Sequence, residues 1–161
     1  MDHRSISRQY DPEGRVNLRG YSGSMATYAA LVGLALLGGR VTGQRLLDRT
    51  SAADVVLGGL ATHQLSRLLA KGSVASPLRA PFTEFDDAAG AAEHHEHARN
   101  TVGELLTCPF CVAVWLGTAY AGGLVVAPRA TRTAATAFSV VAVSDWLHLG
   151  YEVLRKRAGA E

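Results

Sequence analysis

Residues 105–128 of the chain read LLTCPFCVAVWLGTAYAGGLVVAP and contain no Asp, Glu, Lys or Arg. A helix needs about 20 predominantly apolar residues to cross the hydrocarbon core of a bilayer. A second run without those four residue types covers residues 20–39. The two runs predict membrane-spanning helices, and they therefore favour an all-α membrane protein.

Length and composition exclude several other classes of protein. The chain has 161 residues, a formal net charge of +2, 48% hydrophobic residues and 19% charged residues, which fits one domain. Glycine without a repeat and only two cysteines exclude a collagen and a disulfide-stabilised scaffold. The arginines flank the apolar runs and form no dense patch, so no nucleic-acid partner is expected.

The hydropathy pattern predicts four transmembrane helices, over residues 21–39, 51–70, 104–127 and 133–154. A polar N-terminal tail at 1–20 and a basic C-terminal tail at 155–161 flank this membrane domain of residues 21–154. The first and third helices are the most apolar, whereas the second and fourth carry ionisable side chains. The N-terminal arginines and the lack of a clear cleavage site favour a retained signal-anchor over a cleaved leader.

The distribution of basic residues predicts that both ends of the chain lie inside. With four spans, the two tails and the loop at 71–103 share one side and hold ten Lys or Arg residues. The other two loops hold five. Positively charged loops favour the cytoplasmic side, so we expect an N-in/C-in topology.

The loop between the second and third helices, residues 71–103, divides into two parts. Pro77 and Pro81 disfavour helix in the first part, which predicts an extended or turning segment along the inner membrane surface. Arg79, Pro81 and Phe82 would form its contact surface for a partner. The second part, 84–100, is acidic and contains EHHEH at 93–97, so we predict a flexible, solvated loop. Weak chelation of a divalent metal is the alternative for its histidines.

Ionisable side chains on the second and fourth predicted helices point to a polar cluster. His63 and Arg67 share one helix face, and Asp145 and His148 share another. At 1.5 Å per residue, these four and the two cysteines fall at similar depth in the inner half of the bilayer. We predict that Arg67 and Asp145 form an ion pair that fixes helix packing. A proton or ion relay and contact of Arg67 with lipid phosphates are the alternatives.

The sequence Cys108-Pro109-Phe110-Cys111 opens the third predicted helix. Cysteines three residues apart lie one helical turn from each other, close enough to form a disulfide or to bind one metal. A helix N-terminus lowers a thiol pKa and so favours the reactive thiolate. A structural zinc site needs four ligands, and His63 and His148 would complete the set. Buried packing of two small residues is the third reading, and no cofactor is expected under it.

Five short blocks of sequence suggest a family. They are ATHQLSR at 61–67, SPLRAPFT at 76–83, GELLTCPFC at 103–111, APRATR at 127–132 and SDWLH at 144–148. In this order they resemble small bacterial membrane proteins that carry domain of unknown function 1360, over roughly residues 55–151. The resemblance implies a multi-pass protein of the bacterial cytoplasmic membrane. It brings no reaction, although some members are described as sporulation proteins.

These observations leave three functional hypotheses. The leading one is a non-enzymatic interaction or assembly module in the lipid bilayer, with a protein partner still to be found. The second is a membrane thiol-redox or metal-binding protein that uses Cys108 and Cys111. The third is a soluble helical bundle. Small residues such as Gly58 and Gly59 leave open whether helices pack within one chain or between copies. Phosphate loops, nucleotide fingerprints and hydrolase motifs are absent from the sequence, so an enzyme is not favoured.

Overall fold

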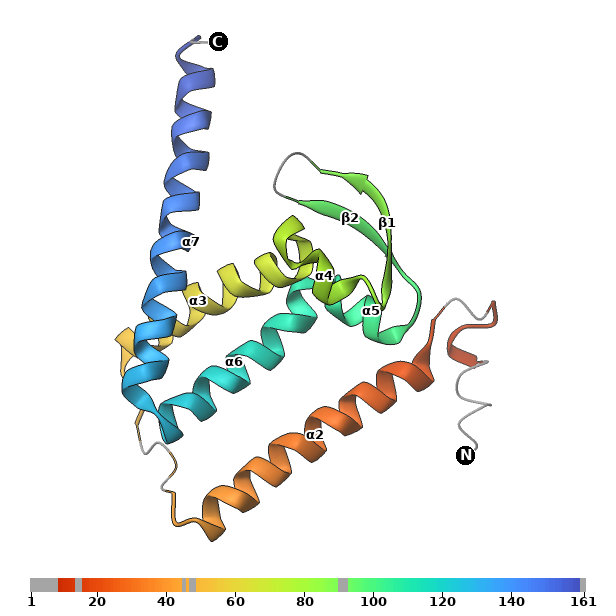
Figure 1. The fold of residues 1–161 in the computed structure, drawn as a ribbon, viewed down its shortest axis with the longest axis vertical. Coiled ribbons are helices and arrows are strands. Elements are labelled where there is room, and N and C mark those ends of the chain that lie inside the picture. The colour runs from red at the N-terminus through yellow and green to blue at the C-terminus, as the bar shows by residue number, and fades with distance from the viewer. Residues whose placement is uncertain (1–8, 14–15, 45, 47–48, 90–92, 160–161) are drawn as a thin grey trace. The chain divides into compact units, whose positions relative to one another are not determined.

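The computed structural model describes residues 9–13, 16–44, 46, 49–89 and 93–159 (Figure 1). It is mostly helical, which confirms the predicted class in its coarse form. The chain forms two compact units, Met1–Gly43 and Gln44–Glu161. The predicted tail at 1–20 lies partly outside the described residues, as does the end of the tail at 155–161.

The first unit contains the helix α2, Leu18–Val41, which covers the predicted helix at 21–39. Asn17 caps its N-terminus, since its side chain accepts a hydrogen bond from the Gly20 amide at 3.0 Å. Beyond the last turn, Gly43 adopts a φ of +71°, which glycine reaches without steric cost. The uncharged run therefore forms one continuous helix with a defined beginning and end.

Three long helices form the frame of the second unit: α3 at Ala52–Lys71, α6 at Pro109–Val126 and α7 at Pro128–Arg157. Ser51 caps α3, and a proline occupies the first turn of α6 and of α7, where its missing N–H has no intrahelical partner in any case. α7 runs in the same direction as α3, because contacts with α3 follow each other in order along both helices. The predicted helices at 51–70, 104–127 and 133–154 correspond to these three.

Small residues allow α3 and α7 to approach closely. The buried residues of α7 are Ala135, Ser139 and Ala142, which recur at helical spacing on one face. Ser139 donates a hydrogen bond to the Leu57 carbonyl of α3 at 2.9 Å. Packing of backbone against backbone through small side chains is common between membrane helices.

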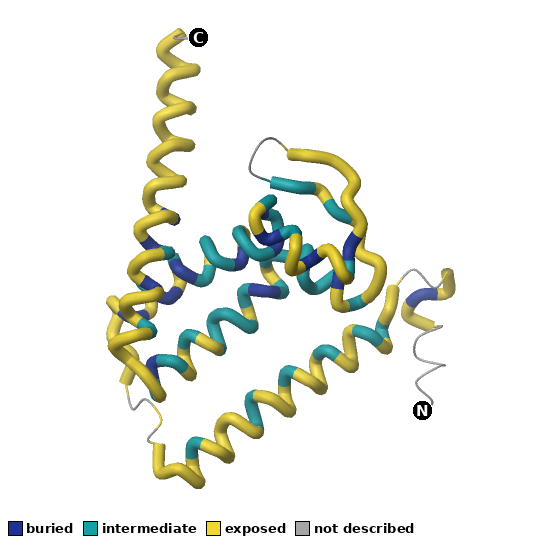
Figure 2. Tube along the Cα trace, viewed as in Figure 1, coloured by how far each residue is buried: buried dark blue, intermediate teal, exposed yellow. Residues whose placement is uncertain are grey.

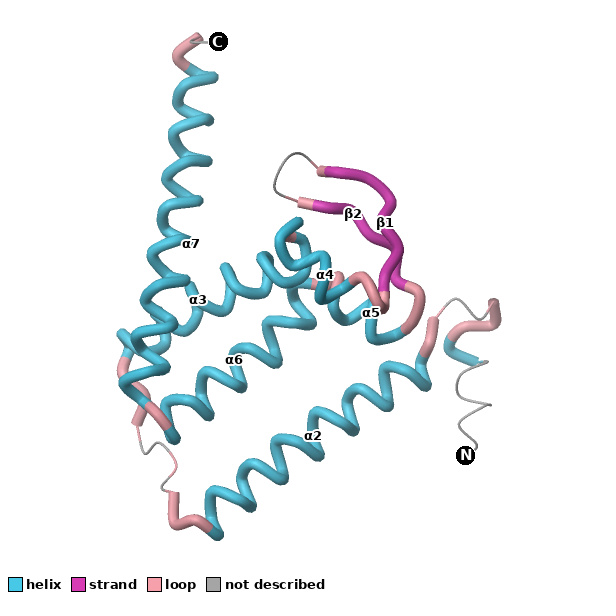
Figure 3. The backbone as a smooth tube through the Cα atoms, viewed as in Figure 1, coloured by secondary structure: helices cyan, strands magenta, loops and turns pink. Residues whose placement is uncertain are grey.

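The described residues between α3 and α6 form regular elements (Figure 3). The first part, predicted to be extended or turning, contains a 3₁₀ turn, Ser73–Ala75, and the short helix α4, Ser76–Arg79, which the prolines were expected to disfavour. An antiparallel hairpin of β1, Thr83–Ala88, and β2, His94–Ala98, replaces the predicted flexible loop. The helix α5, Thr101–Leu106, then leads to α6. The hairpin is stable here because its side chains pair with α4, as described below.

Two helices of the described chain, α2 and α6, are long and apolar enough to cross a membrane. The structure thus supports two of the four predicted spans. α3 and α7 exist at the predicted positions but do not reach that apolarity. The polar side chains of α3 include Asp54, His63, Gln64 and Arg67, and α7 carries charge at both ends.

Candidate functional site

Cys108 and Cys111 form a dithiol at the start of α6. Both are free and half-buried. Cys108 is the N-cap residue, with an extended backbone (φ −100°, ψ 106°), and Pro109 begins the helix behind it. This turn places the two sulfur atoms 2.7 Å apart, with the Cys111 thiol donating to Cys108 Sγ. The predicted proximity of the two cysteines is therefore present in the structure.

The local hydrogen bonds distinguish the two sulfurs. Cys108 Sγ accepts from the Cys111 backbone N–H at 3.3 Å as well as from the Cys111 thiol. Cys108 Sγ therefore receives two donors, and the Cys111 thiol is one of them. Cys108 is accordingly the sulfur that this geometry favours as the nucleophile, and Cys111 is placed to attack it in turn.

The dithiol is joined to the hairpin through α5. Asn100 caps α5 by accepting from the Gly103 amide at 2.9 Å. Gly103 lies against the Phe82 carbonyl so closely that a Cβ there would overlap it. Within the described part of the chain, Glu104 Oε2 is a buried side-chain oxygen without a hydrogen-bond partner. Cys108 follows Glu104 by four residues, so the dithiol lies close in sequence to the tight contact between Gly103 and Phe82.

Arg79 lies inside the structure, which makes the prediction of an exposed interaction residue wrong. Its side chain is 1% exposed, and all five guanidinium N–H groups have acceptors. Two of the five bonds reach Glu96 of β2, and the others reach backbone carbonyls at the end of α3 and Ser76. Of the other two predicted contact residues, Pro81 is exposed and Phe82 is half-buried. The prediction failed because the carboxylate of Glu96, 17 residues away in the hairpin, pairs with Arg79 and allows it to be buried.

Glu96 is the centre of this polar network. Besides Arg79, it accepts from the hydroxyls of Thr83 at 2.7 Å and Ser76 at 3.2 Å. The hydrogen bond from Arg79 is the main cause that lowers the pKa of Glu96 to about 2, against the opposing effect of burial. Ser76 also contacts His94 Nδ1 at 2.9 Å. Glu96 therefore holds both strands of the hairpin onto α4 as a carboxylate.

The predicted zinc ligands are not gathered into a site. Among the residues that the structure describes, no group of three or more His, Cys, Asp or Glu side chains could hold a metal ion. The ring of His63 packs instead against Trp146 of α7, with centroids 5.9 Å apart. His148 is exposed on α7. His63 of α3 and Trp146 of α7 contact each other, whereas the dithiol lies at the start of α6.

The predicted ion pair between Arg67 and Asp145 is also absent from the described contacts. Arg67 pairs with Glu93, which directly precedes β2 on the turn side of the hairpin. Asp145 accepts a hydrogen bond from Gln64 Nε2 at 2.8 Å. The prediction placed α3 beside α7 correctly, but it paired Arg67 with the wrong carboxylate because it treated the loop at 84–100 as unstructured.

A second ion pair, which the sequence reasoning missed, joins the beginnings of α3 and α7. Arg132 donates to Asp54 through Nε at 2.7 Å and through Nη2 at 3.0 Å. Asp54 also accepts from Ser51 at 2.9 Å, and Tyr120 of α6 donates to its backbone carbonyl at 2.9 Å. The sequence signal was the Ser-x-x-Asp start of α3, which indicates a capped helix but does not identify the partner.

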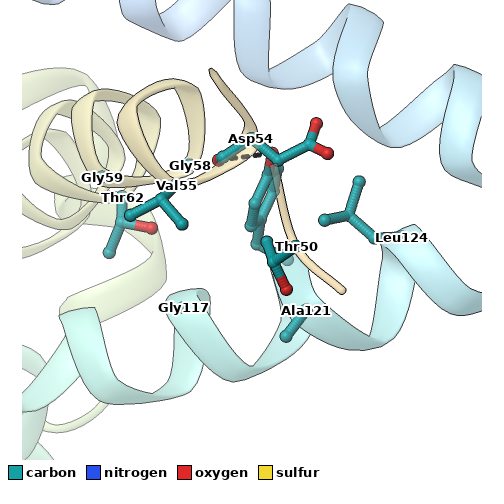
Figure 4. Close-up of a pocket in the computed structure, with 10 residues that line it drawn as sticks. Thr50, Asp54, Val55, Gly58, Gly59, Thr62, Gly117, Ala121 and Leu124 are labelled. Atoms are coloured by element: carbon teal, nitrogen blue, oxygen red, sulfur yellow. Dashed lines mark hydrogen bonds between the residues drawn. The ribbon is translucent and has the colours of Figure 1, made fainter. Parts of the chain in front are cut away.

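A cavity of about 370 Å³ lies next to this ion pair, between α3 and α6 (Figure 4). Its walls are mostly small or apolar residues, among them Gly58, Gly59, Gly117 and Ala121. A Cβ on Gly58 would lie 2.6 Å from Cδ1 of Tyr120, so only glycine admits the ring at this distance. Its polar lining residues are Thr50, Asp54, Thr62 and Tyr120.

A known protein family matches the part of the chain that contains the hairpin and the dithiol. The family described as "Protein of unknown function (DUF1360)" matches residues 57–151. The chain belongs to the DUF1360 family. No curated protein and no solved structure matches the chain. The resemblance seen in the sequence blocks is thereby confirmed.

The DUF1360 region contains the whole polar network and the dithiol. It begins in α3, and it includes the hairpin, α5, α6 and most of α7. The helix α2 and the basic residues at 155–157 lie outside it. Arg79, Glu96, Cys108 and Cys111 are therefore part of the DUF1360 domain, whereas one of the two candidate membrane helices is not.

Proposed function

We propose that this DUF1360 protein is a membrane protein with a redox-active dithiol that exchanges with disulfides of a partner. The observation that carries the proposal is the 2.7 Å contact between the sulfurs, with two donors on Cys108. Two cysteines at the same spacing but without hydrogen-bond donors to either sulfur would be expected only to fill space between helices. Here one sulfur is prepared as the nucleophile, and the other is within reach to resolve its adduct.

A membrane location is supported by the apolar surface of α6. Phe110, Val114 and Val126 are exposed on this helix although it packs against α3 and α7. Water disfavours such a surface at about 25 cal/mol per Å² of apolar area, whereas acyl chains cover it without that cost. α2 and α6 would cross the bilayer, and α3 and the first half of α7 would pack beside α6.

The distribution of charge supports an inner position of the dithiol in the bacterial cytoplasmic membrane. Lys71 ends α3 and Arg99 follows the hairpin, and basic residues favour the cytoplasmic side. Cytosolic thiols are kept reduced, and disulfides that form there are mostly transient. The resting form of the pair would be the dithiol.

The proposed reaction is thiol–disulfide exchange with a partner disulfide as the oxidant. The Cys108 thiolate attacks one partner sulfur, a mixed disulfide forms, and the other partner sulfur leaves and takes up a proton. Cys111 then loses its proton and attacks Cys108 Sγ. The partner's second thiol is released, and two electrons have passed from the protein to the partner.

The test uses the full chain in detergent, reduced and then freed of reductant, with an aromatic disulfide reagent such as dithiobis-nitrobenzoate as the partner. The wild-type chain is expected to release two reagent thiolates and to lose two hydrogens in mass. Cys111→Ser should stop as a stable mixed disulfide. Cys108→Ser should react more slowly than Cys111→Ser, because the remaining Cys111 sulfur lacks the two donors that Cys108 has.

The two single variants are matched controls, because the chain has only these two cysteines. Equal rates for both variants, with no internal disulfide in the wild-type chain, would leave the cysteines as packing residues. Zinc is measured in the same samples. Stoichiometric zinc released by the reagent would replace the redox proposal with the metal-binding alternative.

A further inference from the structure

The second half of α7, residues 143–157, is unlike the first. Residues 135, 139 and 142 are buried against the bundle, whereas every residue from 143 to 157 is exposed (Figure 2). We call residues 143–157 the α7 extension. Near its beginning, Asp145 accepts the last described hydrogen bond between α7 and α3, from Gln64.

The α7 extension is amphipathic. With 3.6 residues per turn, one face carries Asp145, His148, Glu152, Arg155 and Lys156. The opposite face carries Val143, Trp146, Leu147, Gly150, Val153 and Leu154, and Arg157 ends it. Leu147 and Leu154 are 70% and 66% exposed, and half of Trp146 is exposed although it contacts His63. This apolar face is therefore exposed among the residues of the second unit that the structure describes.

The composition of the extension favours a membrane surface over a membrane interior. Two acidic residues and two basic residues on one face make a central position in the bilayer costly. Trp146 and Tyr151 belong to the residue types that concentrate at the membrane–water boundary. Arg155, Lys156 and Arg157 close the helix with positive charge, which anionic headgroups attract.

We infer that the α7 extension lies in the plane of an anionic membrane surface, with Trp146, Leu147, Val153 and Leu154 among the acyl chains. The polar face then meets headgroups and water, as in other interfacial amphipathic helices. The predicted fourth span at 133–154 is thereby replaced by two parts: a first half that packs on α3 and a second half that rests on the membrane. This inference is independent of the dithiol proposal and shares with it only the membrane location.

The test places single tryptophans in the full chain. Trp115→Phe leaves Trp146 in the extension, and Trp146→Phe leaves Trp115 in α6 as the reference. Each protein is reconstituted into vesicles of phosphatidylcholine and phosphatidylglycerol with bromines at a shallow or a deep acyl position. Trp146 should be quenched most by shallow bromines, and Trp115, about 9 Å along α6, by deeper ones.

A matched pair of variants tests the two faces of the extension. Leu147→Glu with Leu154→Glu, in the protein that retains Trp146, should abolish the quenching of Trp146 by bromolipid. His148→Gln on the polar face should leave it unchanged. Replacing phosphatidylglycerol by phosphatidylcholine should weaken the quenching. The thiol reactivity of Cys108, measured on the same samples, should stay the same in all of them.

Three results would overturn the inference. Strongest quenching of Trp146 by deep bromines would make residues 133–154 a true span. Quenching of Trp115 alone would mean that a protein, or a second copy of the chain, covers the apolar face. Quenching of neither tryptophan would exclude the membrane location itself, without bearing on whether the dithiol is reactive.

Discussion

Arg79 and Glu96 form a two-point ion pair inside the structure, with Nε–Oε2 and Nη2–Oε1 distances of 3.0 and 2.8 Å. The two side chains are 1% and 5% exposed. Such a pair is costly to desolvate, and removal of one partner leaves a buried charge uncompensated. The pair therefore determines whether the hairpin stays on α4.

Replacing Arg79 by Met should destabilise the protein by about 3–5 kcal/mol, because Glu96 then remains buried without its cation. The midpoint of thermal unfolding in detergent measures the effect. Arg99→Met is the matched control. Arg99 pairs with Glu84 on the same hairpin at 3.7 Å, and both are exposed. That change should cost less than about 1 kcal/mol, and equal losses would contradict the role given to Arg79.

Acid should release the hairpin through Glu96. The carboxyl has a pKa of about 2 in the folded chain against an ordinary value of 4.5, so its ionised form is bound more strongly in the folded state. Its contribution is complete above pH 4.5 and is lost as the pH falls from 4.5 towards 2. The loss amounts to about 3 kcal/mol.

Unfolding midpoints measured between pH 6 and pH 3 check this prediction. Glu96→Gln should flatten the curve over that window, whereas Glu84→Gln should follow the wild-type slope. A wild-type slope in Glu96→Gln would assign the acid sensitivity to other carboxylates.

Gly58→Ala should destabilise the α3–α6 contact by about 1–3 kcal/mol, because the new methyl group would overlap the ring of Tyr120. Gly59→Ala is the matched control on the same helix, since a Cβ there meets nothing within 4 Å. Alanine in place of a helical glycine should leave that variant unchanged or more stable. The thermal unfolding midpoints of both variants measure the effect. Similar losses of stability in Gly58→Ala and Gly59→Ala would contradict the close contact between Gly58 and Tyr120.

The pair of Asp54 and Arg132 should stabilise the end of the bundle in a salt-dependent way. Arg132→Gln and Asp54→Asn should each lower the unfolding midpoint, and the double variant should lose less than the two losses added together. Arg129→Gln, one turn before Arg132 on an exposed position, serves as the control. Additive losses in this cycle would show that the two side chains do not act as a pair.

Much of the helical framework was predictable from the sequence, because its determinants are local. The uncharged runs locate α2 and α6, and Pro109 and Pro128 mark the beginnings of α6 and α7. The spacing of Cys108 and Cys111 predicts two adjacent sulfurs at any helix N-terminus. Ser51 indicates the start of α3 in the same way.

The polar network was not predictable, because its partners lie far apart in sequence. Glu96 sits among histidines and acids whose composition resembles a solvated loop, and its contact with Arg79 joins the hairpin to α4. Arg67 likewise takes Glu93 rather than Asp145. Composition indicates only whether a segment is polar on average. The ion-pair partner of a given side chain depends on which residue the fold places next to it.

The contact between Gly58 and Tyr120 has an evolutionary consequence. A larger residue at 58 and the tyrosine ring at 120 cannot occupy the same space. Related sequences should therefore change at the two positions together, with a smaller side chain at 120 wherever 58 is not glycine. Two residues 62 positions apart would then be inherited as one unit.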